Sequence, residues 1–253
     1  MKNRNFFLIP CRMESTRFPN KPLLPIDGLP MFAHVYKRVQ LMKNAKSSEN
    51  VIRVCTPNEE IIDQCVRHNI EVVETSFDHV NGTERIAEAA RTLGAADDDI
   101  VVNVQGDDPL VIPSDVEELN AYHSSFRHLD MVIPHLRTDD PKNELAGKIV
   151  TDSADKILYI SRNTIPSNYR KNISYKKHLS IYSFRNDALQ LFAKEPETEL
   201  EKSEGIEALR GLELGFNMQT FALQNEYTPV DVPEQYELVK EFMKTDQIRK
   251  LYS

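Results

Sequence analysis

The chain has 253 residues, enough for one large domain or two small ones. With 31 lysine and arginine residues against 39 aspartate and glutamate residues, its formal net charge is −8. This charge excludes a general nucleic-acid binder, which needs a basic face for phosphates, but is compatible with a small anionic substrate. Only 8 residues are glycine, and neither the P-loop pattern G-x-x-x-x-G-K-[ST] nor the dinucleotide fingerprint G-x-G-x-x-G occurs.

Short apolar runs alternate with amphipathic segments through the first half of the chain. The predicted strands are 6–9, 51–55, 71–73, 100–104 and 131–136. The predicted helices are 30–43, 58–69, 83–93 and 114–126, the last with Ser114 as its cap and Glu117 as the capping-box partner. This alternation predicts an α/β fold with a Rossmann-like, mostly parallel sheet and helices on both of its faces.

The pattern loosens after about residue 137. A hairpin is predicted at 148–151 and 156–160, strands at 178–184 and 218–223, and helices at 187–193, 203–214 and 233–244. We therefore expect one α/β domain, 1–253, that carries a smaller α+β part.

Cysteine usage and the first residues bear on the compartment. Cys11, Cys55 and Cys65 form no C-x-x-C pair and are odd in number, which is typical of a reducing environment. The apolar stretch at 6–10 is too short for a signal peptide or a membrane span. We predict a cytoplasmic protein without membrane contact.

The segment 10–22 follows the first predicted strand and contains three cations, Arg12, Arg17 and Lys21, together with three prolines. Ligands of open α/β sheets bind beyond the carboxyl ends of the strands. Guanidinium forks and a lysine at that position can hold a triphosphate without a glycine-rich loop. The alternative is a solvated basic loop.

Seven motifs spread over almost the whole chain resemble, in the same order, those of sugar-acid cytidylyltransferases, and most closely the 3-deoxy-manno-octulosonate (KDO) cytidylyltransferase family. They are P-C-R-M-E-S-T-R-F-P-N-K-P at 10–22, N-G-T-E-R at 81–85, N-V-Q-G-D-D-P at 103–109, Y-I-S-R-N-T-I-P at 159–166, K-H-L-S-I-Y at 177–182, I-E-A-L-R at 206–210 and V-D-V-P-E at 230–234.

The resemblance implies a CTP-dependent enzyme that transfers CMP to the anomeric hydroxyl of a KDO-type sugar acid and releases pyrophosphate, for lipopolysaccharide or capsule biosynthesis. It implies a homodimer, with 1–136 mainly binding nucleotide, 137–225 mainly binding sugar and forming the dimer, and 226–253 contributing a metal-ligand loop and a closing helix. Mg²⁺ is the implied cofactor, with Asp107 and Asp231 as its ligands. On spacing alone, Asp107 is typical of a turn and Asp231 of a helix N-cap.

The resemblance also implies a role for each matched side chain. The implied catalytic residues are Lys21, Arg12 and Asp107. The implied nucleotide-binding residues are Arg12, Arg17, Lys21, Gly82, Thr83 and Gln105. The implied sugar-binding residues are Gln105, Arg162, His178, Tyr182 and Glu207. Taken singly, Thr83 is as typical of a helix cap, His178 of a hydrogen-bonded strand histidine and Tyr182 of a core aromatic residue.

The chain departs from the family motifs at several positions. Two departures, Ser180 in place of Gly and Ala208 in place of Gln, fall in the sugar motifs, so the substrate can be a modified sugar acid such as an amino-deoxy analogue. The others are Cys11 for Ala, Asn20 for Gly, Asp108 for Glu and Val232 for Thr. Asn20 tolerates the left-handed backbone that Gly would adopt.

Three competing interpretations stay open: a cytidylyltransferase for another sugar acid, a non-catalytic nucleotide-sugar-binding protein, and a small glycosyltransferase. A glycosyltransferase would need a D-x-D metal motif after a strand. The only such string, 97–99, precedes the predicted strand 100–104, which indicates a solvated loop.

Overall fold

The computed structural model describes residues 3–14, 18–139, 147–170, 173–226 and 228–252, so Arg17 lies outside the described residues. Its largest element is a seven-stranded sheet, whose pairings are parallel except the two made by β12. The strands are, in spatial order, β13 (Met218–Gln219), β7 (Met131–Val132), β12 (Tyr182–Arg185), β6 (Ile100–Asn103), β1 (Asn5–Pro10), β4 (Asn50–Thr56) and β5 (Val72–Glu74).

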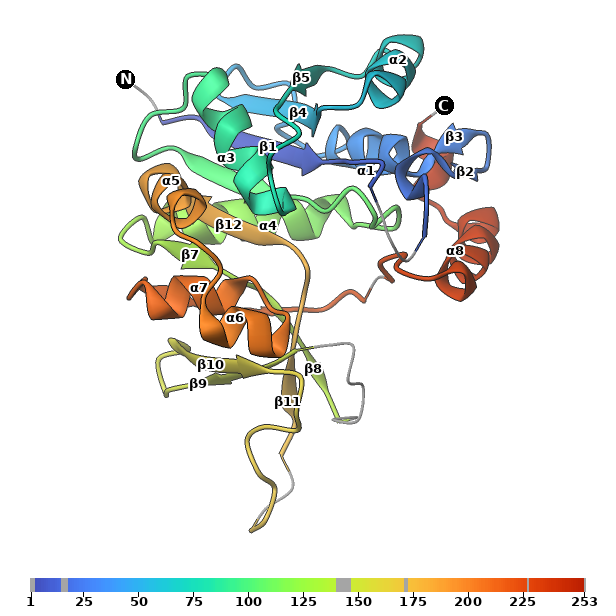
Figure 1. Ribbon diagram of the computed structural model, residues 1–253. Coiled ribbons are helices and arrows are strands. Elements are labelled where there is room, and N and C mark those ends of the chain that lie inside the picture. Colours follow the sequence, from blue (N-terminus) through green and yellow to red (C-terminus); the bar gives the residue numbers. More distant parts are fainter. Residues whose placement is uncertain (1–2, 15–17, 140–146, 171–172, 227, 253) are drawn as a thin grey trace.

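Both faces of this sheet are buried. In β1, Phe7 and Ile9 pack into one apolar core while Phe6 and Leu8 pack into another, as the alternation of a strand requires. The first core is covered by α1 (Met31–Val39), α2 (Glu59–Arg67) and α4 (Pro113–Ser125), and the second by α3 (Gly82–Thr92), α5 (Asn186–Lys194) and α7 (Ala208–Glu213). Figure 1 shows these helix layers on either side of the central strands. The predicted α/β fold with helices on both faces is confirmed.

A second, five-stranded sheet lies beneath the large one in Figure 1. Its strands are, in spatial order, β10 (Ile157–Ser161), β9 (Lys148–Thr151), β11 (Tyr175–His178), β8 (His135–Thr138) and β14 (Ala222–Leu223). The predicted hairpin at 148–160 is the antiparallel pair β9–β10, and Asp155 in its turn has a positive φ of 59°. This sheet is the smaller α+β part expected in the second half.

Three predicted strands run between the large sheet and the small one and are each interrupted on the way. The segments 131–136, 178–184 and 218–223 are divided into β7 and β8, β11 and β12, and β13 and β14. Pro134 lies at the first interruption, where it has no N–H to continue a ladder, and its carbonyl instead accepts from the N–H of Leu179 at 3.2 Å. The interrupted strands join the two sheets into one body.

Two local predictions were wrong. The helix expected at 203–214 is two helices, α6 (Glu199–Glu204) and α7, because Gly205 adopts a left-handed conformation (φ 60°) and ends the first. Ser114 does not cap α4, which begins at Pro113 after an N-cap at Ile112, and Glu117 accepts a hydrogen bond from the N–H of Lys43 instead.

The remaining elements close the molecule around the large sheet. They are the 3₁₀ turns η1 (Lys21–Leu23) and η2 (Arg249–Leu251), the short hairpin β2 (Pro25–Ile26) and β3 (Leu29–Pro30), and α8 (Pro233–Thr245). Val239 and Met243 of α8 pack against Ile26 and Met31, which brings the end of the chain back to the beginning. No helix among the described residues has the length and apolarity needed to cross a bilayer.

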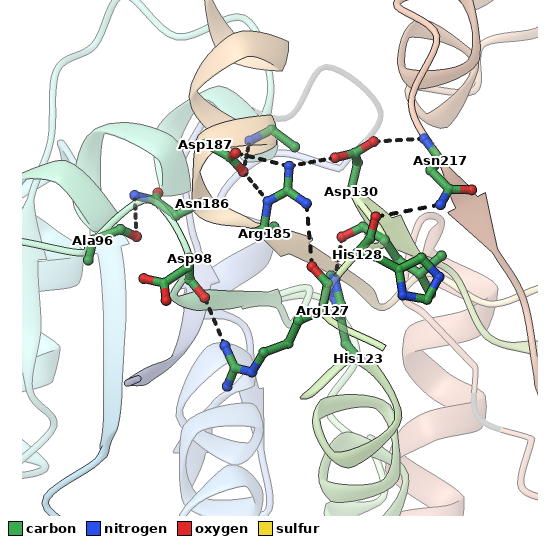
Figure 2. A network of polar contacts seen from close by, with 12 residues as sticks. Ala96, Asp98, His123, Arg127, His128, Asp130, Arg185, Asn186, Asp187 and Asn217 are labelled. Atoms are coloured by element: carbon green, nitrogen blue, oxygen red, sulfur yellow. Dashed lines mark hydrogen bonds and ion pairs between the residues drawn. The ribbon is translucent and has the colours of Figure 1, made fainter. Parts of the chain in front are cut away.

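A polar clamp holds the sheet where β12 ends and β7 and β13 begin (Figure 2). Arg185 donates to Asp187 at 2.6 Å and to Asp130 at 2.8 Å, and Asp130 accepts from the backbone N–H of Asn217 at 2.8 Å. The clamp holds three strands and the start of α5 together at the end of the sheet opposite the carboxyl ends of β1 and β6.

Candidate active site

A cavity of about 360 Å³ lies beyond the carboxyl ends of β1 and β6, where an open α/β sheet binds its ligands. Five segments far apart in sequence form its wall: the loop after β1, the start of α3, the loop after β6, the residue before α7 and the segment before α8. The residues that line it are Pro10, Cys11, Arg12, Glu14, Lys21, Pro22, Asn81, Gly82, Arg85, Gln105, Gly106, Asp107, Glu207 and Asp231.

Two glycines allow these segments to touch. A Cβ at Gly106 would lie 2.6 Å from the Sγ of Cys11 and 2.8 Å from the carbonyl oxygen of Pro10, closer than atoms can approach. A Cβ at Gly82 would lie 3.0 Å from the Pro10 ring. The few glycines of the chain therefore include two where the β6 loop and α3 pack on the end of β1.

Lys21 and two carboxylates meet at one point of the cavity wall. The Lys21 Nζ lies 2.6 Å from Asp107 Oδ2 and 3.6 Å from Asp231 Oδ1. Asn20 precedes η1 with a left-handed φ of 57°, as expected for the position where the family has glycine. The carbonyl of Asp107 accepts from the N–H of Val230 at 2.9 Å, so the two acidic segments are held side by side.

Asp231 is not the helix cap that its spacing suggests. The N-cap of α8 is Val232, and the side-chain oxygen of Gln235 accepts from the backbone N–H groups of Asp231 at 2.6 Å and Val232 at 3.1 Å. The Asp231 carboxylate instead faces Lys21 on the wall of the cavity.

The two aspartates fit a hard divalent cation. No group of three or more His, Cys, Asp or Glu side chains suited to a metal occurs among the described residues. Asp107 and Asp231, however, already aim oxygens at one cationic atom, the ammonium of Lys21. Mg²⁺ in nucleotide sites commonly takes one or two carboxylates and completes its shell with phosphates and water, and this pair fits that pattern.

A second cavity, of about 420 Å³, adjoins the first. The two share Gln105, Asp107, Glu207 and Asp231 in their linings. The other lining residues come mainly from β11, the bend before β12, the link between α6 and α7, and the segment before α8: Gly147, Arg162, Lys177, His178, Leu179, Ser180, Tyr182, Gly205, Ile206, Glu226, Thr228, Pro229 and Gln235. The structure thus brings Gln105, Arg162, His178, Tyr182 and Glu207 together, as expected for one substrate pocket.

Polar side chains of this second cavity are held by their neighbours. The Arg162 guanidinium donates to the carbonyls of Glu204 at 2.7 Å and Gly205 at 2.9 Å. Burial, with a smaller contribution from Arg162, lowers the pKa of His178 to about 4, so its ring is neutral near pH 7. The His178 and Tyr182 rings lie 5.3 Å apart, and burial raises the pKa of the Tyr182 hydroxyl.

Several lining residues had no role assigned from the sequence, and three of them are charged side chains with partners at the cavities. Arg85, the last residue of the N-G-T-E-R motif, lines the first cavity and donates to Thr75 Oγ1 at 2.7 Å and to the Ser76 carbonyl at 2.9 Å. Lys177 and Glu226 form an ion pair at the second cavity. The motif letters could have suggested Arg85 and Lys177, but Glu226 lies in no motif.

Thr83 differs from the expected nucleotide contact. Its side chain is fully buried, does not line the first cavity, and donates a hydrogen bond to Glu207. Nor does it cap α3: Asn81 is the N-cap, accepting from the N–H of Glu84 at 2.8 Å. Arg12 does line the first cavity and donates to the carbonyl of Val80 at 2.9 Å.

The acidic string 97–99 lies at the opposite end of β6 from the cavities. The carboxylate of Asp99 accepts from the N–H groups of Arg4 at 2.7 Å and Ala96 at 2.8 Å, so it fixes the turn before the strand. The prediction of a solvated loop is confirmed for Asp97 and Asp98, which are exposed, and wrong for Asp99, which is buried; the structure gives no support to a D-x-D metal site at this string.

Comparison with known proteins identifies the family of the chain. The model of the cytidylyltransferase family matches residues 6–225. The 8-amino-3,8-dideoxy-manno-octulosonate cytidylyltransferase of Shewanella halifaxensis (strain HAW-EB4) is 38% identical over 250 residues, which cover 94% of this chain and 98% of the relative. The 3-deoxy-manno-octulosonate cytidylyltransferase of Koribacter versatilis (strain Ellin345) is 38% identical over 244 residues, covering 94% and 89%.

Solved structures give the same result. The structure of CMP:2-keto-3-deoxy-manno-octonic acid synthetase complexed with CTP superposes with a TM-score of 0.88 at 30% identity, covering 96% of this chain and 99% of that one. A cytidylyltransferase from Leptospira borgpetersenii serovar Hardjo-bovis (strain JB197), with a TM-score of 0.64 at 17% identity over 97% of this chain and 88% of that one, shares the fold. From the matched family model and the full-length relatives, the chain belongs to the cytidylyltransferase family.

Proposed function

We propose that the protein transfers CMP from CTP to the anomeric hydroxyl of a KDO-type sugar acid and releases pyrophosphate. The observation that carries this proposal is that two cavities meet at Gln105, Asp107, Glu207 and Asp231. A nucleotide in the first cavity and a sugar acid in the second would bring their reacting atoms together at these shared residues. Such a transfer depends mainly on positioning and on neutralising charge.

In the first cavity, Arg12 and Lys21 are the proposed triphosphate-binding cations, and Lys21 would stabilise charge on the α-phosphate. Lys21 suits that role because its side chain is only 12% exposed and its ammonium lies at the junction of the cavities. Gly82, the first residue of α3, lines this cavity, and free N–H groups at a helix start attract negative charge. Arg17 is proposed for the same site on the family resemblance alone.

Mg²⁺ is the proposed cofactor, held by Asp107 and Asp231. When bound it would supply positive charge to the phosphate oxygens and to the attacking sugar hydroxyl. The support from this chain is the pair of carboxylates that converge on one ammonium and the hydrogen bond between their two segments.

In the second cavity, Arg162 is the proposed partner of the sugar carboxylate, because a guanidinium matches a carboxylate in a fork. Gln105, His178, Tyr182 and Glu207 supply mixed donors and acceptors suited to a polyol. The neutral His178 ring offers one donor and one acceptor near pH 7.

A second candidate substrate is the 8-amino analogue, which the relative from Shewanella halifaxensis is named for. Two carboxylates, Glu207 and Glu226, line the second cavity and could accept hydrogen bonds from an ammonium group. Ser180 adds a hydroxyl at the same cavity where the family has glycine. These features favour an amino sugar more than the family motifs alone do.

The test is pyrophosphate release by the purified protein with Mg²⁺, each of the four nucleoside triphosphates, and a panel of 2-keto-3-deoxy sugar acids that includes KDO and its 8-amino analogue. We expect turnover with CTP and with at least one of these two acids. Binding of CTP without turnover of any acid would refute the enzymatic proposal and favour a non-catalytic nucleotide-binding protein.

We also propose a homodimer through the second half of the chain. The support is the family resemblance, together with two exposed side chains in this half that a partner could cover: Leu158 on the edge strand β10 is 55% exposed and Tyr169 is 90% exposed. Light scattering should give twice the chain mass, and Leu158→Glu should give the chain mass. A monomeric wild type would contradict the proposal. The division of labour among 1–136, 137–225 and 226–253, the cytoplasmic location and a role in lipopolysaccharide or capsule synthesis stay predictions.

A further inference from the structure

Thr83 belongs to a nucleotide motif by sequence, but its side chain faces the other substrate. It is the second residue of α3, fully buried, and its Oγ1 donates to Glu207 Oε2 at 2.6 Å. Glu207 lies 124 positions later in the chain, immediately before α7, and lines both cavities. The bond therefore links the helix of the first cavity to a carboxylate of the second.

Asn103 at the end of β6 fixes the direction of this bond. Its Nδ2 donates to Thr83 Oγ1 at 3.3 Å, and the Asn103 side chain is fully buried. A hydroxyl has one proton to donate and two lone pairs to accept with. Because Asn103 occupies one lone pair of the oxygen, the proton of Thr83 is directed at Glu207. The two hydrogen bonds thus run in one direction, from Asn103 through Thr83 to Glu207, and lead from the centre of the sheet toward the cavity.

The other surroundings of Glu207 explain why such a bond matters. Burial raises the pKa of its carboxyl, Glu201 and Glu84 act in the same direction, and the hydrogen bond from Thr83 and the charge of Arg210 lower it. The bond from Thr83 therefore favours the ionised form and restrains one of its two oxygens. The carboxylate is left with acceptor capacity for a ligand in the second cavity.

We propose that Thr83 is a positioning residue for the sugar acid: it orients the Glu207 carboxylate to accept hydrogen bonds from the sugar hydroxyls and does not itself bind nucleotide. The inference rests on the proposed function, since it needs a sugar acid in the second cavity. The family resemblance gives Thr83, in the N-G-T-E-R motif, to nucleotide binding. This proposal gives it to the sugar acid instead.

The experiment compares steady-state kinetics of Thr83→Val, Thr83→Ala and Thr83→Ser with the wild type, varying CTP and sugar acid separately. Val and Ala lack the hydroxyl, whereas Ser keeps it. For Thr83→Val and Thr83→Ala we expect the KM for the sugar acid to rise about tenfold, while the KM for CTP and kcat stay within about twofold of the wild type. This is the pattern expected when binding of the ground state is lost. Ser should restore the wild-type values.

The matched control is Thr220→Val, which removes another fully buried threonine hydroxyl, bonded to His135 Nδ1 at 2.8 Å and outside both cavities. It should lower the melting temperature without changing either KM. Thr83→Ala serves as the second variant should Thr83→Val not fold, because alanine places no methyl group in the position of the hydroxyl beside the Asn103 amide. In a Glu207→Gln background, Thr83→Ala should raise the sugar KM by less than it does alone.

A rise in the KM for CTP, an unchanged KM for the sugar acid, or the same kinetic effect in Thr220→Val would overturn the proposal. Failure of the proposed function gives a different result, because the wild type would then release no pyrophosphate with any sugar acid.

Discussion

Asp107→Asn is the substitution that best isolates the chemistry from the fold. It keeps the shape of the side chain and removes one charge 2.6 Å from the Lys21 ammonium. At an effective dielectric constant of about 20 that attraction is about 6 kcal/mol before desolvation is subtracted. Since the Asp107 side chain is 28% exposed, most of this is offset, and we expect a stability loss of only about 1–2 kcal/mol.

Activity should fall far more than stability. If Asp107 is one of two carboxylate ligands of Mg²⁺, its loss should lower kcat about 10³-fold, or about 4 kcal/mol of transition-state free energy. The Mg²⁺ concentration needed for half-maximal pyrophosphate release should rise as well. Asp231→Asn should act in the same direction with a smaller stability loss, because its oxygen lies 3.6 Å from Lys21.

The matched control is Asp99→Asn at the opposite end of β6, where the carboxylate accepts from two backbone N–H groups. It should cost about 1–3 kcal/mol of stability and leave the kinetics and the Mg²⁺ dependence unchanged. An Asp107→Asn enzyme that turns over CTP at the wild-type rate and Mg²⁺ concentration would falsify the metal assignment.

Three further outcomes are expected. Ser180→Gly should change the ratio of kcat/KM for the 8-amino acid to that for KDO by about tenfold, and an unchanged ratio would exclude this hydroxyl from substrate discrimination. Arg185→Met should lower the unfolding free energy by about 1–3 kcal/mol in denaturant titrations and leave kcat and KM unchanged. A change in kcat or KM would contradict a purely structural role for Arg185 in the clamp of Figure 2. Burial lowers the pKa of His34, His123 and His135 to about 4. Unfolded histidines bind protons from about pH 6.5, so stability should fall as pH drops from 6.5 toward 4, by up to about 1.4 kcal/mol per pH unit for each residue. Equal melting temperatures at pH 7.5 and 5.0 would contradict this.

Much of the fold followed from the period of the apolar residues. In β1 the run Phe6 to Ile9 predicts a strand buried on both faces, and its alternate residues do enter two different cores. Every helix expected before residue 137 exists, because amphipathic stripes of two or more turns carry a strong signal. Their ends were less predictable: the helix expected to reach residue 43 ends at Val39.

What the sequence did not predict depends on contacts between distant segments. The interruption near Pro134 arises because the strand leaves one sheet for another, and neither sheet is visible in a local window. Gly205 ends α6 within a stretch whose apolar spacing continues through it. The partner of Thr83 lies 124 positions away, so the motif that contains it could not reveal that its hydroxyl turns toward Glu207.

Stability and chemistry are concentrated at opposite ends of the sheet. At the end of the sheet shown in Figure 2, the carboxylates of Asp130 and Asp187 accept hydrogen bonds from Arg185 and from backbone N–H groups. Beyond the carboxyl ends of the strands, the Nε2 of His178, which lines the second cavity, has no hydrogen-bond partner among the described residues. A buried polar atom without a partner costs about 1–3 kcal/mol. Unpartnered buried atoms occur elsewhere in the chain too. Only an atom at a cavity, however, can gain its missing partner from a bound substrate. The well-satisfied end of the sheet therefore provides stability that lets the other end keep the His178 nitrogen unpaired until a ligand binds.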